Sequence, residues 1–278
     1  MVRDETMPDY FDFTRLYETI GNENWFTVNS ALNDGYNVIN HDGHANFMSM
    51  GMGDDYYYTW DAEALHNFPR CGVLYSIGCW PAAFDYECIA ESFVNNSNGG
   101  LVAFVGNSRY GWGSPGNPGF GYSDYFDHAF WKNIFDGHPS LGEAIMLMKA
   151  YYAPYARWEN VWRWKEYEVN LIGEPGMVLW QNEPITAEIE LPTSIDTGGV
   201  EIAVALPGYL SVAAIQDGEI LDRGTAYGEI DIWIESVTGS PVEIAVSDPK
   251  GYRHMLIDTL YVDAGRPYIC LLYTSPSP

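Results

Sequence analysis

Basic residues are scarce in this sequence. Lysine and arginine together number 13, against 38 aspartates and glutamates, which gives a formal net charge of −25 over 278 residues. Proteins that bind nucleic acid need cations to neutralise phosphate, so this balance argues strongly against a nucleic-acid partner. It argues equally against attraction to anionic membrane surfaces. The balance fits a solvated acidic surface, a salty or calcium-containing medium, or a cationic substrate.

Long apolar runs are absent as well. No stretch approaches the roughly 18 apolar residues of a membrane-spanning helix, so no membrane span is expected. The first six residues, MVRDET, contain no apolar signal-peptide core. Apolar residues nevertheless make up 47% of the chain and aromatic residues 15%, which predicts a folded protein with a substantial core.

Cysteine is sparse, and its spacing matches no zinc pattern of the CxxC type. Of the four cysteines, Cys71 and Cys88 fit buried apolar thiols, and a disulfide between them is an alternative that the sequence does not require. The sequence also lacks a nucleophile elbow, a P-loop and a dinucleotide-binding fingerprint. These absences remove several common enzyme classes.

The sequence contains no complete set of metal ligands. His41 and His44 form only a weak metal-binding pair, because they lie on a loop without further ligands at suitable spacing. Asp54 and Asp55 are compatible with a structural calcium ion, although the sequence around them contains no complete calcium-binding loop. We therefore expect no required cofactor.

Strand and helix patterns alternate before residue 180. This alternation predicts a parallel α/β sheet, with a Gly- and Pro-rich functional loop over residues 110–122. Helices are expected over residues 13–20, 24–34, 60–67, 124–135 and 140–153, with another capped by Asp85; strands are expected over 36–40, 72–77 and 101–105, and a strand with a turn over 167–176.

The pattern changes near residue 181. Short runs of alternating apolar and polar residues predict an antiparallel β-sandwich of about 85 residues. The expected domains are therefore 1–181 and 182–268. The last nine residues, Cys270–Pro278, resemble a translated sequencing adapter, so residues 269–278 are expected to be a non-native tail.

His44 and Cys79 each follow a predicted buried strand. Alone, the histidine would suggest a polar loop residue and the cysteine a buried thiol. Together they end consecutive strands, and the carboxyl ends of parallel strands are where catalytic groups collect. A thiol and an imidazole that meet there form a nucleophile and its base, and the Cys79 N–H is a natural donor to an oxyanion.

Seven ordered sequence blocks run through the first part of the chain. They are VINHDGHA (38–45), YSIGC (75–79), FD (84–85), CIAESF (88–93), GGLVAFVGNSR (99–109), LGEA (141–144) and LIGEP (171–175). Together these blocks resemble the gingipain-like cysteine peptidases of the caspase-like clan. The resemblance covers residues 14–180 approximately, and it implies a caspase-like three-layer sandwich with a mainly parallel, incomplete sheet, followed by an Ig-like sandwich.

The resemblance also implies site residues. It predicts a His44–Cys79 dyad and an oxyanion site formed by the backbone N–H groups of Cys79 and Ala45, where the family usually has glycine instead of Ala45. Trp112 is expected near the wall of the primary specificity pocket. Asn107 and Ser108 are expected to border the substrate cleft.

The function expected from these observations is a secreted or bacterial surface cysteine endopeptidase that acts on proteins or peptides. Family catalytic domains carry a further portion before the first matched block, so an N-terminally truncated chain is expected. Two alternatives stay open. One is a sortase-like transpeptidase of a bacterial secretion system, and the other is an inactive surface or adhesion protein. The side chain preferred before the scissile bond is not predicted.

Overall fold

The computed structural model describes residues 6–117, 119–181, 185–186, 191–192, 194–196, 198–236, 239–247 and 254–263. The chain divides into two compact units, Met1–Leu179 and Trp180–Pro278. Residues 182–184, next to the predicted domain boundary, and the predicted tail with Cys270 lie outside the described residues. Among the described residues, no helix is long and apolar enough to cross a membrane.

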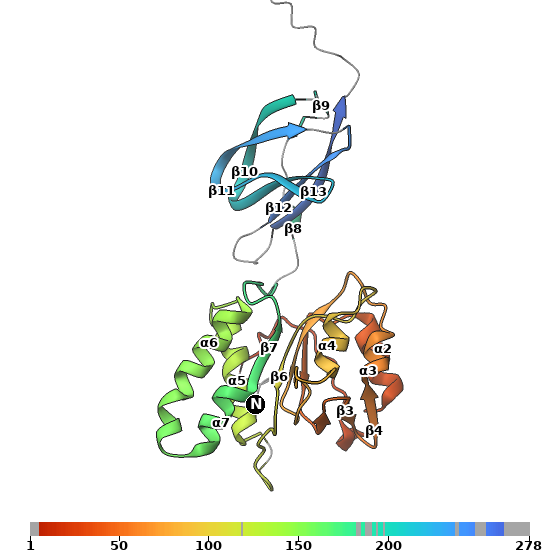
Figure 1. Cartoon of the computed structure of the whole chain (residues 1–278), viewed down its shortest axis with the longest axis vertical. Helices are drawn as coiled ribbons and strands as arrows, with labels where there is room; N and C mark the ends of the chain where they lie inside the picture. The colour runs from red at the N-terminus through yellow and green to blue at the C-terminus, as the bar shows by residue number, and fades with distance from the viewer. Residues whose placement is uncertain are drawn as a thin grey trace, which may run out of the picture. The chain divides into compact units, whose positions relative to one another are not determined.

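The first unit is built on a mixed sheet with the strand order β1-β5-β6-β7. Strands β1, β5 and β6 run parallel, whereas β7 is antiparallel to β6, so the predicted sheet is confirmed as mainly parallel (Figure 1). The bounds are β1 (Val38–His41), β5 (Gly72–Ser76), β6 (Leu101–Asn107) and β7 (Val169–Gly173).

Helices cover both faces of this sheet and give three layers. In Figure 1, α2, α3 and α4 lie on one side of the sheet, and α5, α6 and α7 lie on the other. The bounds are α2 (Trp25–Asp34), α3 (Thr59–Glu63), α4 (Ile89–Val94), α5 (Tyr122–Phe135), α6 (Leu141–Tyr152), a 3₁₀ segment η2 (Ala153–Arg157) and α7 (Asn160–Glu168).

The central strand β5 shows why the sheet needs two helical layers. Val73 and Tyr75 belong to the core shared with α5 and α6, whereas Leu74 belongs to the core shared with α2, α3 and α4. All three side chains are at most 2% exposed. A strand buried on both faces reads as a continuous apolar run, and this run made β5 predictable.

A small antiparallel sheet follows β1 and was not predicted. It pairs β2 with β3 and β3 with β4, with bounds β2 (Ala45–Asn46), β3 (Ser49–Met52) and β4 (Asp55–Tyr58). Its first strand begins directly after His44. The segment that carries His44 is therefore held by a sheet rather than being a free loop.

Three expectations about helices need correction. The helix expected over residues 13–20 is only a 3₁₀ turn, η1 (Glu18–Ile20), because the Asn22 side chain accepts from the Tyr17 N–H and donates to the Arg15 carbonyl. The helix expected to reach residue 67 ends at Glu63. The Asp85 side chain caps no helix and pairs with Arg109, while Cys88 precedes α4.

In contrast, α2 forms where predicted. The Asn24 side chain accepts from two backbone N–H groups of the first turn.

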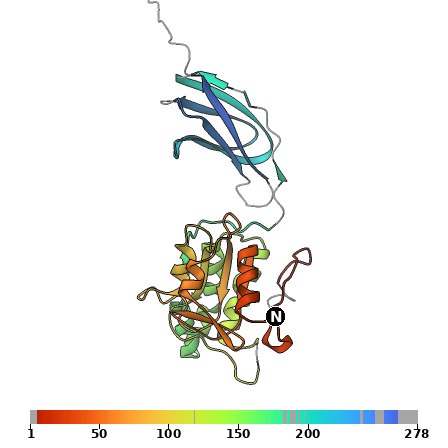
Figure 2. The same ribbon diagram turned by 90° about the vertical axis from the view of Figure 1, so that its right-hand side faces the viewer.

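The second unit consists of strands in its described residues (Figure 2). Most pairs are antiparallel, as predicted, but β13 pairs in parallel with β8 and with β9. Alternate apolar residues of β10, β11 and β12 form one core. The Ig-like topology stays a prediction. The bounds are β8 (Ile185–Thr186), β9 (Ser194–Asp196), β10 (Gly198–Gln216), β11 (Glu219–Ser236), β12 (Val242–Ser247) and β13 (His254–Asp263).

Candidate active site

The two segments of interest leave the same edge of the sheet. Strands β1 and β5 are parallel neighbours, and their last residues, His41 and Ser76, are in register. The Ile77 N–H donates to the His41 carbonyl at 3.1 Å, which continues the pairing beyond the strands. The segments that carry His44 and Cys79 therefore begin next to each other, at His41 and Ser76.

Gly78 is where these two segments touch. A Cβ atom at this position would lie 2.6 Å from the Ala45 Cβ, 2.9 Å from the Gly43 carbonyl oxygen and 3.1 Å from the Ala45 nitrogen. The first two distances are shorter than real Cβ atoms show and the third is unusually tight, so a side chain here would force the two segments apart. The residues on both sides of His44 thus lie against the residue that precedes Cys79.

His44 is exposed, and its backbone is anchored. The His44 carbonyl accepts from the Gly51 N–H at 2.7 Å, and Ala45 pairs with Met50 in the β2–β3 ladder. The imidazole therefore faces solvent from a fixed backbone, which suits a group that exchanges protons with a bound substrate.

Cys79 is half-buried and begins a turn that its neighbours hold in place. Its sulfur lies 3.8 Å from the Gly111 carbonyl. Trp80 adopts a left-handed backbone with φ of 67°, and its N–H donates to the Arg109 carbonyl at 2.8 Å. A positive φ is rare for a bulky residue, so the turn after Cys79 depends on these contacts.

His41 is a structural neighbour of the site that sequence analysis considered only as a weak metal ligand. Its Nε2 lies 3.1 Å from the Gly51 carbonyl, which can only accept, so Nε2 carries the proton. Its Nδ1 therefore accepts from the Ser76 hydroxyl at 2.8 Å, and the Ser76 oxygen accepts from the Gly78 N–H at 3.2 Å. Burial lowers the pKa of His41 to about 4. A neutral His41 thus ties the two segments together.

The three residues expected at the substrate cleft differ in exposure. Trp112 is 44% exposed, whereas Asn107 is 1% exposed and Ser108 is 6% exposed. The Asn107 amide donates to the Ile77 and Gly78 carbonyls at 2.9 and 2.8 Å. Asn107 therefore lies behind the Cys79 segment, where it supports the backbone.

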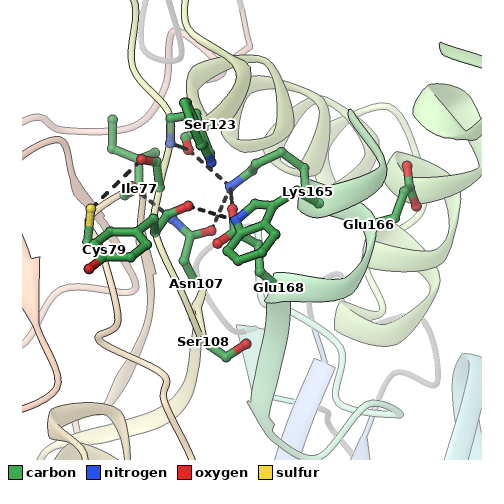
Figure 3. A network of polar contacts seen from close by, with 12 residues as sticks. Ile77, Cys79, Asn107, Ser108, Ser123, Lys165, Glu166 and Glu168 are labelled. Carbon is green, nitrogen blue, oxygen red and sulfur yellow. Dashed lines mark hydrogen bonds and ion pairs between the residues drawn. The ribbon is translucent and has the colours of Figure 1, made fainter. Parts of the chain in front are cut away.

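A buried ion pair lies behind Asn107, and sequence analysis missed it. Lys165 and Glu168, in the last turn of α7, are 0% and 2% exposed in their side chains, with 2.8 Å between Nζ and Oε1. Figure 3 shows the Lys165 side chain reaching toward Asn107 and Ser123, on the side where Cys79 lies. The Trp-rich sequence around this lysine gave no signal of a site.

The other cysteines differ from Cys79 in their surroundings. Cys71, Cys79 and Cys88 are all free, so the alternative of a Cys71–Cys88 disulfide is wrong. Burial raises the pKa of Cys88 to about 11 and also raises the pKa of Cys71. In the described residues, no three His, Cys, Asp or Glu side chains gather as a metal site would require.

Comparison with known proteins identifies the family. The model of peptidase family C25 matches residues 2–180. The chain belongs to peptidase family C25. No curated protein matches it significantly.

Solved structures share the fold of this C25 chain. The crystal structure of the Arg-specific cysteine proteinase gingipain R (RgpB) matches with a TM-score of 0.62 and 15% identity, covering 86% of this chain and 56% of that one. The complex of Porphyromonas gingivalis RgpB pro- and mature domains matches at 0.61 and 15%, with 86% and 57% covered. A structure described only as a protease matches at 0.58 and 17%, with 84% and 56% covered. The chain thus spans a little over half the length of these structures.

Proposed function

We propose that this C25 chain carries the Cys–His centre of a secreted or surface cysteine endopeptidase that cleaves proteins or peptides. One observation supports the proposal above others. An exposed histidine and a half-buried cysteine follow adjacent parallel strands, and their segments touch at Gly78 in a chain of a peptidase family. The comparisons favour neither a transpeptidase nor an inactive surface protein.

The proposed reaction begins with the thiol of Cys79. His44 takes the thiol proton, and the sulfur attacks the carbonyl carbon of the scissile peptide bond, whose oxygen takes up the displaced electron pair. The N–H groups of Cys79 and Ala45 hold this oxyanion. His44 then gives its proton to the leaving amine as the C–N bond breaks, which leaves a thioester on Cys79.

Water completes the cycle. His44 accepts a proton from the water as its oxygen attacks the thioester carbonyl, and the Cys79 sulfur leaves with a proton returned by His44. Every group in this scheme belongs to the substrate, the water or the residues named here. The scheme requires no cofactor.

Peptide cleavage by matched variants tests the proposal. The substrates are a mixture of synthetic peptides that places every amino acid before a scissile bond, with products identified by mass spectrometry. We expect Cys79→Ala to lower kcat at least about 1,000-fold, and His44→Ala to lower it about 100- to 10,000-fold. Cys71→Ala is the control and retains wild-type activity. Absence of cleavage by the wild type, or equal cleavage by Cys79→Ala, would refute the proposed function.

A further inference from the structure

Lys165 is a fully buried cation, and such residues are rare unless they are paired. Three oxygen atoms surround its ammonium group. Asn107 Oδ1 lies at 2.6 Å, Ser123 Oγ at 3.0 Å and Glu168 Oε1 at 2.8 Å from Nζ. An ammonium has three donors and no acceptor, so its hydrogen-bonding capacity matches these three partners. Figure 3 shows them converging on Nζ.

The ion pair meets the end of β6 because of the strand register. Asn107 pairs with Val169, the first residue of β7, and the Ser108 N–H donates to the Glu168 carbonyl at 2.7 Å. The last turn of α7 is therefore fixed beside the carboxyl end of β6. Burial lowers the pKa of Lys165, while attraction to Glu168 and, more weakly, to Cys79 opposes the shift.

The charge on Lys165 decides which way the Asn107 amide faces. Because the ammonium can only donate, the amide oxygen of Asn107 must face it. The amide nitrogen then faces the opposite way, toward the carbonyls of Ile77 and Gly78. These carbonyls belong to the two residues directly before Cys79. A reversed amide would place oxygen against oxygen at both contacts.

Ser123 links the same hydrogen-bond network to the loop over residues 110–122, called the pocket loop below because it carries Trp112. Its oxygen accepts from Lys165 and also from the Trp112 N–H at 2.8 Å. Gly111, the residue before Trp112, lies so close to the Cys79 segment that a Cβ atom there would overlap the Ile77 carbonyl oxygen. One ammonium therefore holds both the Cys79 segment and the segment that carries Trp112.

We propose that Lys165 is a positioning residue for the reaction proposed above. Through Asn107 it fixes the backbone that presents Cys79, and through Ser123 it fixes the pocket loop at Trp112. Lys165 touches no substrate, because its side chain is 0% exposed. The inference rests on the proposed function. Lys165 acts through two branches, one through Asn107 to the Cys79 segment and one through Ser123 to Trp112. We expect the first branch to affect kcat and the second to affect KM.

Three variants separate the branches in peptide cleavage, with rates normalised by titration of active sites. Asn107→Asp puts an oxygen against the Ile77 and Gly78 carbonyls while keeping an acceptor for Lys165, so kcat should fall about 100-fold with KM nearly unchanged. Ser123→Ala releases Trp112, so KM should rise while kcat is largely kept. Lys165→Met combined with Glu168→Leu removes the ion pair without leaving an unpaired carboxylate, and both constants should change.

Lys149→Met is the matched control, because Lys149 is a half-buried lysine that donates to the Glu166 carbonyl and to neither branch. It should keep wild-type kcat and KM. If the Lys165/Glu168 double variant also keeps both constants while Cys79→Ala is inactive, the positioning role is refuted and the proposed function stands. If Cys79→Ala is as active as the wild type, the proposed function fails instead.

A spectroscopic measurement tests the positioning role without relying on activity. Carbonyl ¹³C resonances of Ile77 and Gly78 should shift in Asn107→Asp and in the Lys165/Glu168 double variant, and the Trp112 amide should shift in Ser123→Ala. None should shift in Lys149→Met. Unchanged Ile77 and Gly78 resonances in the double variant would overturn the proposal whatever the peptide assay shows.

Discussion

Replacing Gly78 by alanine tests whether close approach of the His44 and Cys79 segments creates the site. The added Cβ would lie 2.6 Å from the Ala45 Cβ and 2.9 Å from the Gly43 carbonyl oxygen. Neither neighbour is the end of a flexible side chain, so the segments must move apart. Overpacking of this kind costs about 1–3 kcal/mol of stability. A displacement near 1 Å between reacting groups costs about 100-fold in rate.

The assay compares kcat for peptide cleavage and the midpoint of urea unfolding. We expect Gly78→Ala to lower kcat about 100-fold and the free energy of unfolding by about 1–3 kcal/mol. Gly208→Ala, in the second unit, is the control, because a Cβ there meets nothing within 4 Å. It should leave both quantities unchanged.

A second substitution checks the cause. Ala45→Gly removes the atom at 2.6 Å from the new Cβ but leaves the Gly43 carbonyl at 2.9 Å. The double variant should therefore recover part of the activity lost by Gly78→Ala. Wild-type activity in Gly78→Ala, or no coupling between the two substitutions, would refute the argument that these segments must touch.

Two further predictions concern pH and packing. Unfolded His41 takes up a proton below its ordinary pKa of 6.5, whereas folded His41 stays neutral to about 4, so stability should fall as pH drops through this window. The free energy of unfolding should fall by at most about 3 kcal/mol between pH 7 and pH 4 from this cause. Urea titrations at both pH values should show that His41→Gln lacks this part of the loss. The same pH dependence in the wild type and in His41→Gln would contradict the prediction. Phe104→Ala should destabilise by about 3–5 kcal/mol, because Phe104 is 0% exposed. Val102→Ala on the same strand, where Val102 is 36% exposed, should cost far less in thermal unfolding, and equal losses would refute the packing argument.

Strands β5 and β6 could be predicted because nearly all of their residues are buried. The runs at residues 72–77 and 101–105 are almost wholly apolar, and the structure forms β5 and β6 there. The ladder of β2, β3 and β4 was missed because its strands are two to four residues long and lack a regular alternation. The helix expected over residues 13–20 was wrong because side-chain contacts of Asn22 replace helical hydrogen bonds.

The placement of His44 and Cys79 beyond the same end of the sheet could be predicted, because each follows one strand of the parallel pair β1 and β5. The roles of Lys165 and Asn107, which lie behind the Cys79 segment, could not be predicted. Lys165 is 86 positions after Cys79 in the sequence, and it reaches Asn107 only through the antiparallel β6–β7 register. Asn107 is expected at the cleft, whereas its side chain donates inward to the Ile77 and Gly78 carbonyls.

The proposed function depends on Cys79 acting as a nucleophile that His44 activates. Covalent labelling by a peptidyl acyloxymethyl ketone, with the labelled residue mapped by mass spectrometry, tests this role. Burial raises the pKa of Cys88 to about 11 and raises that of Cys71, so both thiols should stay unlabelled and serve as internal controls. We expect label on Cys79, and strongly reduced labelling in His44→Ala. Label on Cys71 or Cys88 instead, or undiminished labelling in His44→Ala, would contradict it.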